Sequence, residues 1–284
     1  MKVAIVTDTN SGVVQQVAGT LGVHVVPMPF MIDGDVYYEG INLSQEEFYR
    51  LLSENAEVST SQPAVADVLD YWDRLLGEYD QIVHIPMSSG LSGACDTATT
   101  LSMDYDGRVQ VVNNRRVSVT LLSSILDAVK LAEEGLDARA IKDKLESTQY
   151  DSSIYIMVDT MKYLKKGGRV TATAATVGAV LNIKPVLQIQ GGKLDAYAKP
   201  RGIKAARDVL CDTMKQDLDG RFASFADHLR LYVAYSHDRE AAELFAEEVK
   251  AQFPDREIEI APLPLSVACH IGPGALALAC AVKL

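Results

Sequence analysis

A turn of small hydroxyl residues and glycines stands between a predicted strand and a predicted helix. The turn reads SSGLSG (Ser88–Gly93) and follows the apolar run QIVHIP (Gln81–Pro86). Small side chains leave the backbone N–H groups accessible, and the helix dipole adds partial positive charge, so the turn favours an anion. Ligands of parallel sheets bind at the carboxyl ends of the strands, where we expect this turn. A serine-rich helix cap that binds nothing would explain the same residues.

A second polar segment, TSQP (Thr60–Pro63), precedes a helix that we predict at Ala64–Leu76. Pro63 suits the first helical turn, and we expect Ser61 to be the N-cap. Thr60 is then placed to turn its hydroxyl toward a ligand. Taken alone, such a segment is more typical of helix capping than of binding.

A histidine stands beside a Gly-Pro-Gly turn in the segment CHIGPG (Cys269–Gly274). The turn holds the backbone in a defined shape, which would help the imidazole of His270 to meet a carboxylate. A buried histidine bonded to the backbone is the simpler explanation of the same pattern. The sequence has no HExxH, EF-hand or Cys/His zinc spacing, so we predict no metal site and no cofactor.

The charge of the chain reverses locally. From Asp159 to Asp208 there are ten basic residues and three acidic ones, a net charge of +7, whereas the rest of the chain carries −18. Such asymmetry indicates a docking surface for something acidic or phosphorylated. A solvated basic face without a partner is equally consistent with the charge alone.

The composition is that of a globular protein that does not act on nucleic acid. The chain has 284 residues, 48% hydrophobic and 23% charged, and a net charge of −11. Nucleic-acid binding needs clustered basic residues and is disfavoured. The first apolar run is too short for a signal peptide, and no stretch is long enough for a membrane span. Four cysteines without CxxC spacing favour a reduced, cytoplasmic setting.

Strands alternate with helices over residues 1–150. This alternation predicts a mostly parallel, doubly wound α/β sheet. The expected elements are strands at Val3–Thr7, Gln81–Pro86 and Val109–Asn113 and helices at Ala64–Leu76 and Val119–Glu134, the last ending at Gly135.

The pattern changes from about residue 151. Hairpins mixed with helices predict a second, mixed α+β domain over residues 151–284. The expected elements are strands at Ser153–Val158, Lys184–Gln190, Leu194–Lys199 and Leu229–Ser236, a helix at Asp238–Gln252, and a last strand at Glu257–Pro262.

Taken in order, the motifs of nearly the whole chain resemble those of the DegV family, the fatty-acid-binding proteins that serve as FakB-type subunits of bacterial fatty acid kinase. Each motif alone is weak, but their joint order and spacing is specific. The matching segments are TDT near the start, TSQP (Thr60–Pro63), SSGLSG (Ser88–Gly93), LKKGGRV (Leu164–Val170), IKPVL (Ile183–Leu187), Lys199–Arg201 and His270–Gly274.

The resemblance implies that one long-chain fatty acid lies in a tunnel between or beneath the two domains. Its carboxylate would be held by Thr60 of the TSQP segment and Ser92 of the turn. Ser61 and Gly93 would stand beside them, with His270 nearby. The C-terminal domain would contribute to the tunnel and to the partner surface.

The resemblance also implies a partner. In FakB-type members, arginines of the GGR and K-x-R segments meet a fatty acid kinase, which phosphorylates the presented lipid to acyl phosphate. The matching residues are Arg169 and Arg201, inside the basic stretch. The protein would then be a lipid-binding subunit of phospholipid metabolism and not itself a catalyst. Transient contact with a membrane surface is compatible with this role.

Three other functions remain open from the residues. The segment Gly90–Ala94 nearly spells the G-x-S-x-G elbow, so a serine hydrolase using Ser92 and His270 is the main alternative. A nucleotide-binding protein is less favoured, because neither G-x-x-x-x-G-K-[ST] nor G-x-G-x-x-G is present. A pure protein-interaction module is the third.

Overall fold

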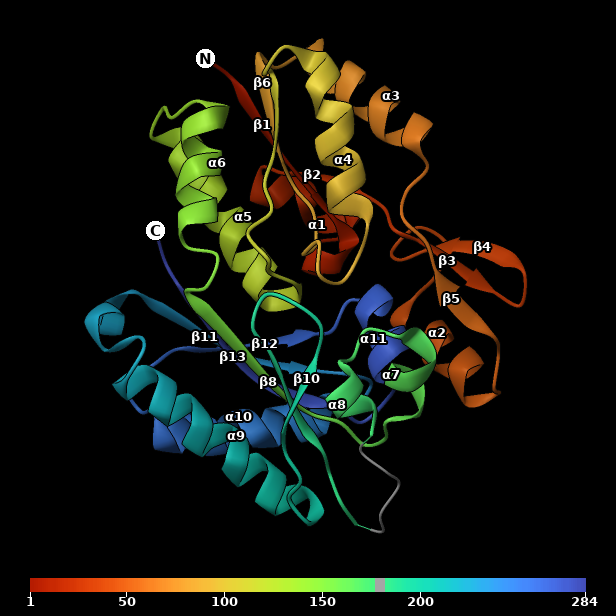
Figure 1. The fold of residues 1–284 in the computed structure, drawn as a ribbon, viewed down its shortest axis with the longest axis vertical. Coiled ribbons are helices and arrows are strands. Elements are labelled where there is room, and N and C mark those ends of the chain that lie inside the picture. The colour runs from red at the N-terminus through yellow and green to blue at the C-terminus, as the bar shows by residue number, and fades with distance from the viewer. Residues whose placement is uncertain (177–181) are drawn as a thin grey trace. The chain divides into compact units, whose positions relative to one another are not determined.

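A computed structural model describes residues 1–176 and 182–284 of the chain (Figure 1). Contacts between residues divide the chain into two compact units, Met1–Gln149 and Tyr150–Leu284. The first unit is described throughout.

The first unit is built on a four-stranded parallel sheet in the order β2-β1-β6-β7. The strands are β1 (Val3–Asp8), β2 (His24–Val26), β6 (Gln81–Ile85) and β7 (Val109–Val111). The predicted parallel sheet is confirmed, and β2 is an addition to it. Because β1 and β6 are adjacent and parallel, the TDT segment at the end of β1 and the SSGLSG turn after β6 meet at the carboxyl end of the sheet.

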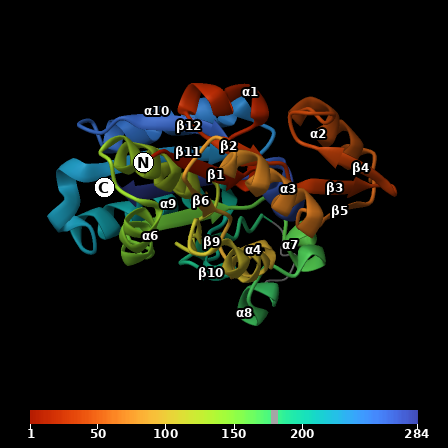
Figure 2. The same cartoon turned by 90° about the horizontal axis from the view of Figure 1, so that it is seen from above.

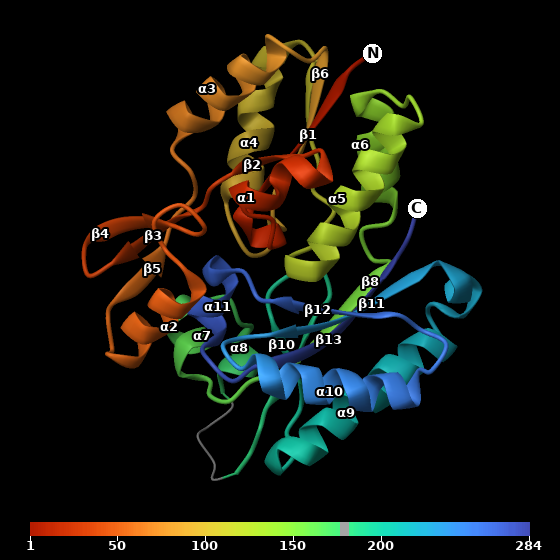
Figure 3. The same ribbon diagram turned by 180° about the vertical axis from the view of Figure 1, so that it is seen from behind.

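Helices cover both faces of this sheet. In Figures 1 and 3, α3 and α4 lie on one side and α5 and α6 on the other, as in a doubly wound fold. The helices are α1 (Gln15–Ala18), α3 (Val65–Leu76), α4 (Ala94–Ser102), α5 (Ser118–Glu133) and α6 (Ala138–Ser147), with short 3₁₀ turns at Thr9–Ser11, Gly19–Leu21 and Met103–Tyr105. Trp72 of α3, Cys95 of α4 and Ile82 of β6 are fully buried in one core cluster.

A small antiparallel sheet, which the sequence did not predict, carries the TSQP segment. Its order is β4-β3-β5, with β3 (Pro29–Ile32), β4 (Asp35–Tyr38) and β5 (Val58–Thr60). Helix α2 (Gln45–Ser53) lies beside it (Figure 2), and the rings of Phe30 and Phe48 are 6.1 Å apart. The strands are only three or four residues long, too short for a clear alternating pattern.

The second unit is built on a six-stranded mixed sheet in the order β10-β9-β8-β13-β11-β12. Among the described strands of this sheet, β11 and β12 pair in parallel and the other neighbours pair antiparallel. The strands are β8 (Ser152–Met157), β9 (Val186–Ile189), β10 (Asp195–Ala198), β11 (Leu229–Tyr235), β12 (Ile258–Pro262) and β13 (Leu276–Val282). The predicted mixed α/β character and the β9–β10 hairpin are confirmed.

The prediction that the strand ending at Pro262 is the last one is wrong. Strand β13 follows it in the chain and lies inside the sheet, between β8 and β11. Its residues LALACAV are all buried, so both faces are apolar and no alternation marks it as a strand.

Helices α9 and α10 run side by side along this sheet (Figure 3). Leu210 of α9 and Phe245 of α10 are fully buried in one cluster with Leu278 of β13. The helices are α7 (Lys162–Gly167), α8 (Ala172–Ala175), α9 (Gly202–Asp219), α10 (Arg239–Gln252) and α11 (Leu265–Ile271), with a 3₁₀ segment at Ala223–His228.

In residues 1–176 and 182–284, every helix is too short or too polar to cross a membrane. All four cysteines are buried thiols that form no disulfide.

Candidate functional site

The SSGLSG turn connects β6 to the N-terminus of α4. Gly93 occupies the N-cap position and has no side chain to cap the helix. Ser92 performs that task instead, because its Oγ accepts a hydrogen bond of 3.2 Å from the Ala94 N–H. Within residues 1–149 the Ser92 hydroxyl donates to no other residue, so its own proton remains available for a ligand.

The turn is fixed by neighbours that sequence reasoning missed. Asn113, at the end of β7, donates from Nδ2 to Ser89 Oγ at 2.8 Å. The Ser88 N–H donates to the Arg116 carbonyl at 2.9 Å. These bonds hold the turn before any ligand arrives, which lowers the entropy cost of binding.

The TSQP segment lies against the same turn. Thr60 ends β5, where it pairs with Phe30 of β3. The Gln62 side chain reaches α4 and accepts a 3.1 Å hydrogen bond from the Thr97 hydroxyl. A methyl group at Gly93 would stand 3.6 Å from Gln62 Oε1, an ordinary van der Waals contact. The structure therefore brings together the two segments that hold Thr60 and Ser92.

The predicted capping role of Ser61 and the predicted place of Pro63 in the first helical turn are wrong. Helix α3 begins at Val65, and its N-cap residue is Ala64. The Ser61 N–H donates to the Pro29 carbonyl at 3.3 Å, so the segment continues the pairing of β5 with β3. Sheet pairing therefore prevails over the local preference for a helix cap.

Two buried ionisable side chains accompany the turn, and both were missed from the sequence. Asp8, at the end of β1, is 2% exposed and accepts a 3.0 Å hydrogen bond from the Met87 N–H. Burial raises the pKa of its carboxyl to about 6, against the opposing effect of that N–H. His84 of β6 is 4% exposed, and burial lowers the pKa of its imidazole to about 4.

In the second unit, His270 lies in the last turn of α11, packed against the end of α7. A methyl group at Gly167 would overlap Nδ1 of His270, so only glycine lets the imidazole lie on this backbone. A methyl group at Gly272 would likewise overlap the ring of Tyr163. Burial, and secondarily the positive charge of Arg169, lowers the pKa of His270 to about 4 and keeps it neutral at pH 7.

The two predicted partner residues also belong to the second unit. Arg169 is half-buried and donates from Nη1 to the Gly167 carbonyl, which places it beside the backbone that supports His270. Arg201 is exposed and is the N-cap residue of α9. Other cations of the basic stretch are neutralised by ion pairs, which join Lys184 to Asp159, Lys204 to Asp208 and Arg207 to Glu248.

The predicted site residues thus form two groups. Thr60, Ser61, Ser92 and Gly93 all belong to the first unit, where Gln62 brings their two segments together. His270 belongs to the second unit, and its approach to the first group stays a prediction.

The hydrolase alternative stays untested, because its two residues, Ser92 and His270, belong to different units. Over the described ranges 1–176 and 182–284, no group of three or more His, Cys, Asp or Glu side chains is arranged to hold a metal ion.

Comparison with known proteins decides the family. A family profile described as "Uncharacterised protein, DegV family" matches residues 2–283. The chain belongs to the DegV family. A DegV domain-containing protein of Listeria innocua is 30% identical to this DegV protein over 99% of both chains.

Solved structures of other DegV proteins share the fold. A DegV family protein from Thermus thermophilus, described by its fatty acid binding, is 30% identical with a TM-score of 0.89, covering 99% of this chain and 100% of its own. A fatty acid binding DegV family protein from Streptococcus agalactiae is 27% identical with a TM-score of 0.88 over 100% of both chains. The similarity therefore extends over the whole DegV fold described above.

Proposed function

We propose that this DegV protein binds one long-chain fatty acid, with the carboxylate at Thr60, Ser92 and His270, and presents it to a fatty acid kinase in the cytoplasm. The observation that carries the proposal is the full-length similarity, at 30% identity and a TM-score of 0.89, to a protein described by its fatty acid binding. The turn at the start of α4 supports it, because a helix N-terminus with an available hydroxyl suits a carboxylate.

The acyl chain would supply most of the affinity. Burying about a dozen methylenes at roughly 0.8 kcal/mol each gives on the order of 10 kcal/mol. A hydrogen bond to a charged group contributes about 1.5–3 kcal/mol. The hydroxyl and imidazole groups would therefore set the orientation and prevent the carboxylate from being buried without partners, which is costly.

The same arrangement suits presentation to a kinase. A carboxylate held at a helix N-terminus would stay where a partner kinase can phosphorylate it. The helix N-terminus also tolerates the added negative charge of the acyl phosphate. Arg169 and Arg201 would meet the kinase, since arginine pairs well with acidic and phosphorylated groups. In this reading the DegV protein supplies the substrate, and the kinase supplies the catalysis.

The direct test is denaturing extraction of the purified protein followed by mass spectrometry of the released lipid. We expect one long-chain fatty acid per chain, and protein that carries no lipid and gains no thermal stability from added fatty acids would contradict the proposal. A fluorogenic ester assay separates the hydrolase alternative: robust turnover that disappears in Ser92→Ala would favour it.

A further inference from the structure

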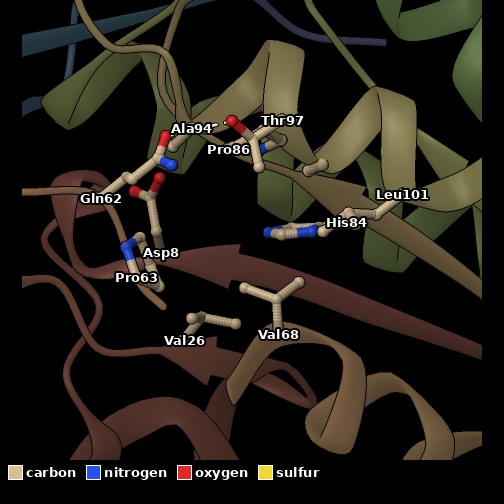
Figure 4. A pocket seen from close by; sticks show the side chains of 11 residues that line it. Asp8, Val26, Gln62, Pro63, Val68, His84, Pro86, Ala94, Thr97 and Leu101 are labelled. Atoms are coloured by element: carbon tan, nitrogen blue, oxygen red, sulfur yellow. Dashed lines mark hydrogen bonds between the residues drawn. The ribbon is translucent and has the colours of Figure 1, made fainter. Parts of the chain in front are cut away.

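A small cavity lies inside the first unit, between the ends of β1 and β6 and the helices α3 and α4. Its volume is about 20 Å³, enough for one water molecule and far too small for an acyl chain. Asp8 and His84 border it, together with the polar side chains of Gln62 and Thr97 and apolar side chains of β2 and α3 (Figure 4). The Gln62 oxygen already accepts a hydrogen bond from Thr97. Ala94, whose N–H donates to Ser92 Oγ, borders the same cavity.

The Asp8 carboxyl is already held on both oxygens. Oδ1 accepts a hydrogen bond from the Asn10 N–H and Oδ2 accepts one from the Met87 N–H, both at 3.0 Å. Each oxygen keeps a second lone pair. If the group takes up a proton, the new O–H needs an acceptor, because a buried donor left without one is costly.

The His84 imidazole can supply that acceptor. Neither of its ring nitrogens has a hydrogen-bond partner anywhere in residues 1–176 or 182–284. The ring meets Trp72 edge to face at 5.5 Å between centroids, a contact that fixes its orientation without satisfying either nitrogen. A neutral imidazole always has one nitrogen that accepts.

We propose that Asp8 and His84 form a buried proton-binding site, in which protonated Asp8 donates through one water in the cavity to the accepting nitrogen of His84. The proton comes from solvent and binds a carboxyl oxygen, and the water accepts the Asp8 O–H while donating one of its own hydrogens to the ring. Of the two groups Asp8 holds the proton, because burial raises its pKa and lowers that of His84. The titratable and charged residues of the elements packed around Asp8 are His24 of β2, His84 of β6, Cys95 and Asp96 of α4, and Asp127, Lys130 and Glu133 of α5; among them, His84, Cys95 and Asp127 are buried.

The proton site would also be coupled to fatty acid binding, and this coupling rests on the proposed function. A ligand carboxylate at Ser92 brings a second negative charge close to Asp8, since Ala94 contacts both the Ser92 hydroxyl and the cavity. The negative charge of one carboxylate raises the pKa of a neighbouring carboxyl group, because two like charges repel each other. Fatty acid binding should therefore draw a proton onto Asp8 at neutral pH.

The proton site is tested without any ligand. Carbon-13 NMR of the carboxyl groups in delipidated wild-type protein, assigned through bonds, should show Asp8 titrating near pH 6. The ordinary value of about 4 would overturn the site. The measurement needs no variant, so it does not depend on how Asp8→Asn folds.

The coupling is tested by calorimetry with oleate, below its aggregation limit, in two buffers of different ionisation enthalpy near neutral pH. Wild type should take up a fraction of a proton, and Asp8→Asn should take up less. Equal uptake would overturn the coupling, as would a wild-type uptake that persists in acid where Asp8 is already protonated. No oleate binding by wild type would overturn the proposed function and the coupling together, while the NMR titration still decides the proton site.

Discussion

The two units hold their candidate ligand-binding side chains in different ways. In the first unit, Thr60 ends β5 and Ser92 follows β6. Their segments are fixed by a hydrogen bond that Asn113 donates to Ser89 and by one that Gln62 accepts from Thr97. In the second, His270 is placed by close packing on Gly167, where no side chain can be tolerated. The comparison teaches that the hydroxyl site depends on a polar network, whereas the imidazole depends on steric fit. The hydroxyl site and the imidazole should therefore respond differently to substitution and to pH.

The largest expected effect comes from removing the hydroxyls. The double variant Thr60→Ala/Ser92→Ala should lose roughly 100-fold or more in fatty acid affinity, because each bond to a carboxylate contributes about 1.5–3 kcal/mol. Ser59→Ala is the matched control, since its side chain points to the opposite face of β5. Binding to delipidated protein can be followed by displacement of a fluorescent fatty acid. Unchanged affinity would remove these hydroxyls from the site.

The next effect is on stability in acid. The pKa of His84 falls from 6.5 to about 4 on folding, so this residue contributes stability above pH 6.5 that is lost as the pH falls toward 4. His84→Phe should lack that loss, and the difference between the two proteins should change by about 3 kcal/mol over this range. Asp8, with its raised pKa, acts in the opposite direction, and the same comparison in an Asp8→Asn background excludes its contribution.

Urea unfolding at a series of pH values measures the His84 effect. Parallel curves for wild type and His84→Phe would mean that the imidazole gains a partner, or is exposed, in solution.

A smaller effect should follow from the steric fit in the second unit. Gly167→Ala places a methyl group on Nδ1 of His270 and should displace the ring. If His270 contacts the carboxylate, affinity should fall about tenfold, the lower end for one bond to a charged group. Gly192→Ala is the control, because nothing lies within 4 Å of its added methyl. Equal affinity of both variants would place His270 outside the site.

The smallest effect concerns the partner surface. Reversing the charge of Arg201, the exposed one of the two predicted partner arginines, should slow acyl-phosphate formation by a kinase several-fold while leaving bound lipid unchanged, since surface ion pairs are individually weak. Lys204→Glu is a suitable control, because Lys204 is an exposed residue of the same stretch that pairs with Asp208. Lipid content and phosphorylation rate are measured on the same preparations. Rates equal to the control would count against this surface.

The sequence predicts those elements whose signals are local. The strands at Val3–Asp8 and Gln81–Ile85 are apolar, β-branched runs bounded by turn residues, and the β9–β10 hairpin is marked by its glycines. Helix α9 was missed although it has 18 residues, since it begins directly after the basic K-x-R segment without a capping side chain.

The missed site residues depend on distant contacts. Asp8 is 79 positions from Met87, and Gln62 is 35 positions from Thr97. Both residues lie in matched motifs, TDT and TSQP, but nothing in the local sequence assigns either of them a partner. Only the adjacency of β1 and β6, and of the TSQP segment and α4, gives these side chains their partners.

The position of β13 has a consequence for biosynthesis. All the strands of the first unit precede Tyr150, so that unit can assemble while the rest is still being translated. The sheet of the second unit is different, because the strand that joins β8 to β11 is the last to be synthesised. Until Leu276–Val282 emerges, β8 and β11 each keep an unpaired edge, the kind of surface at which nascent chains aggregate.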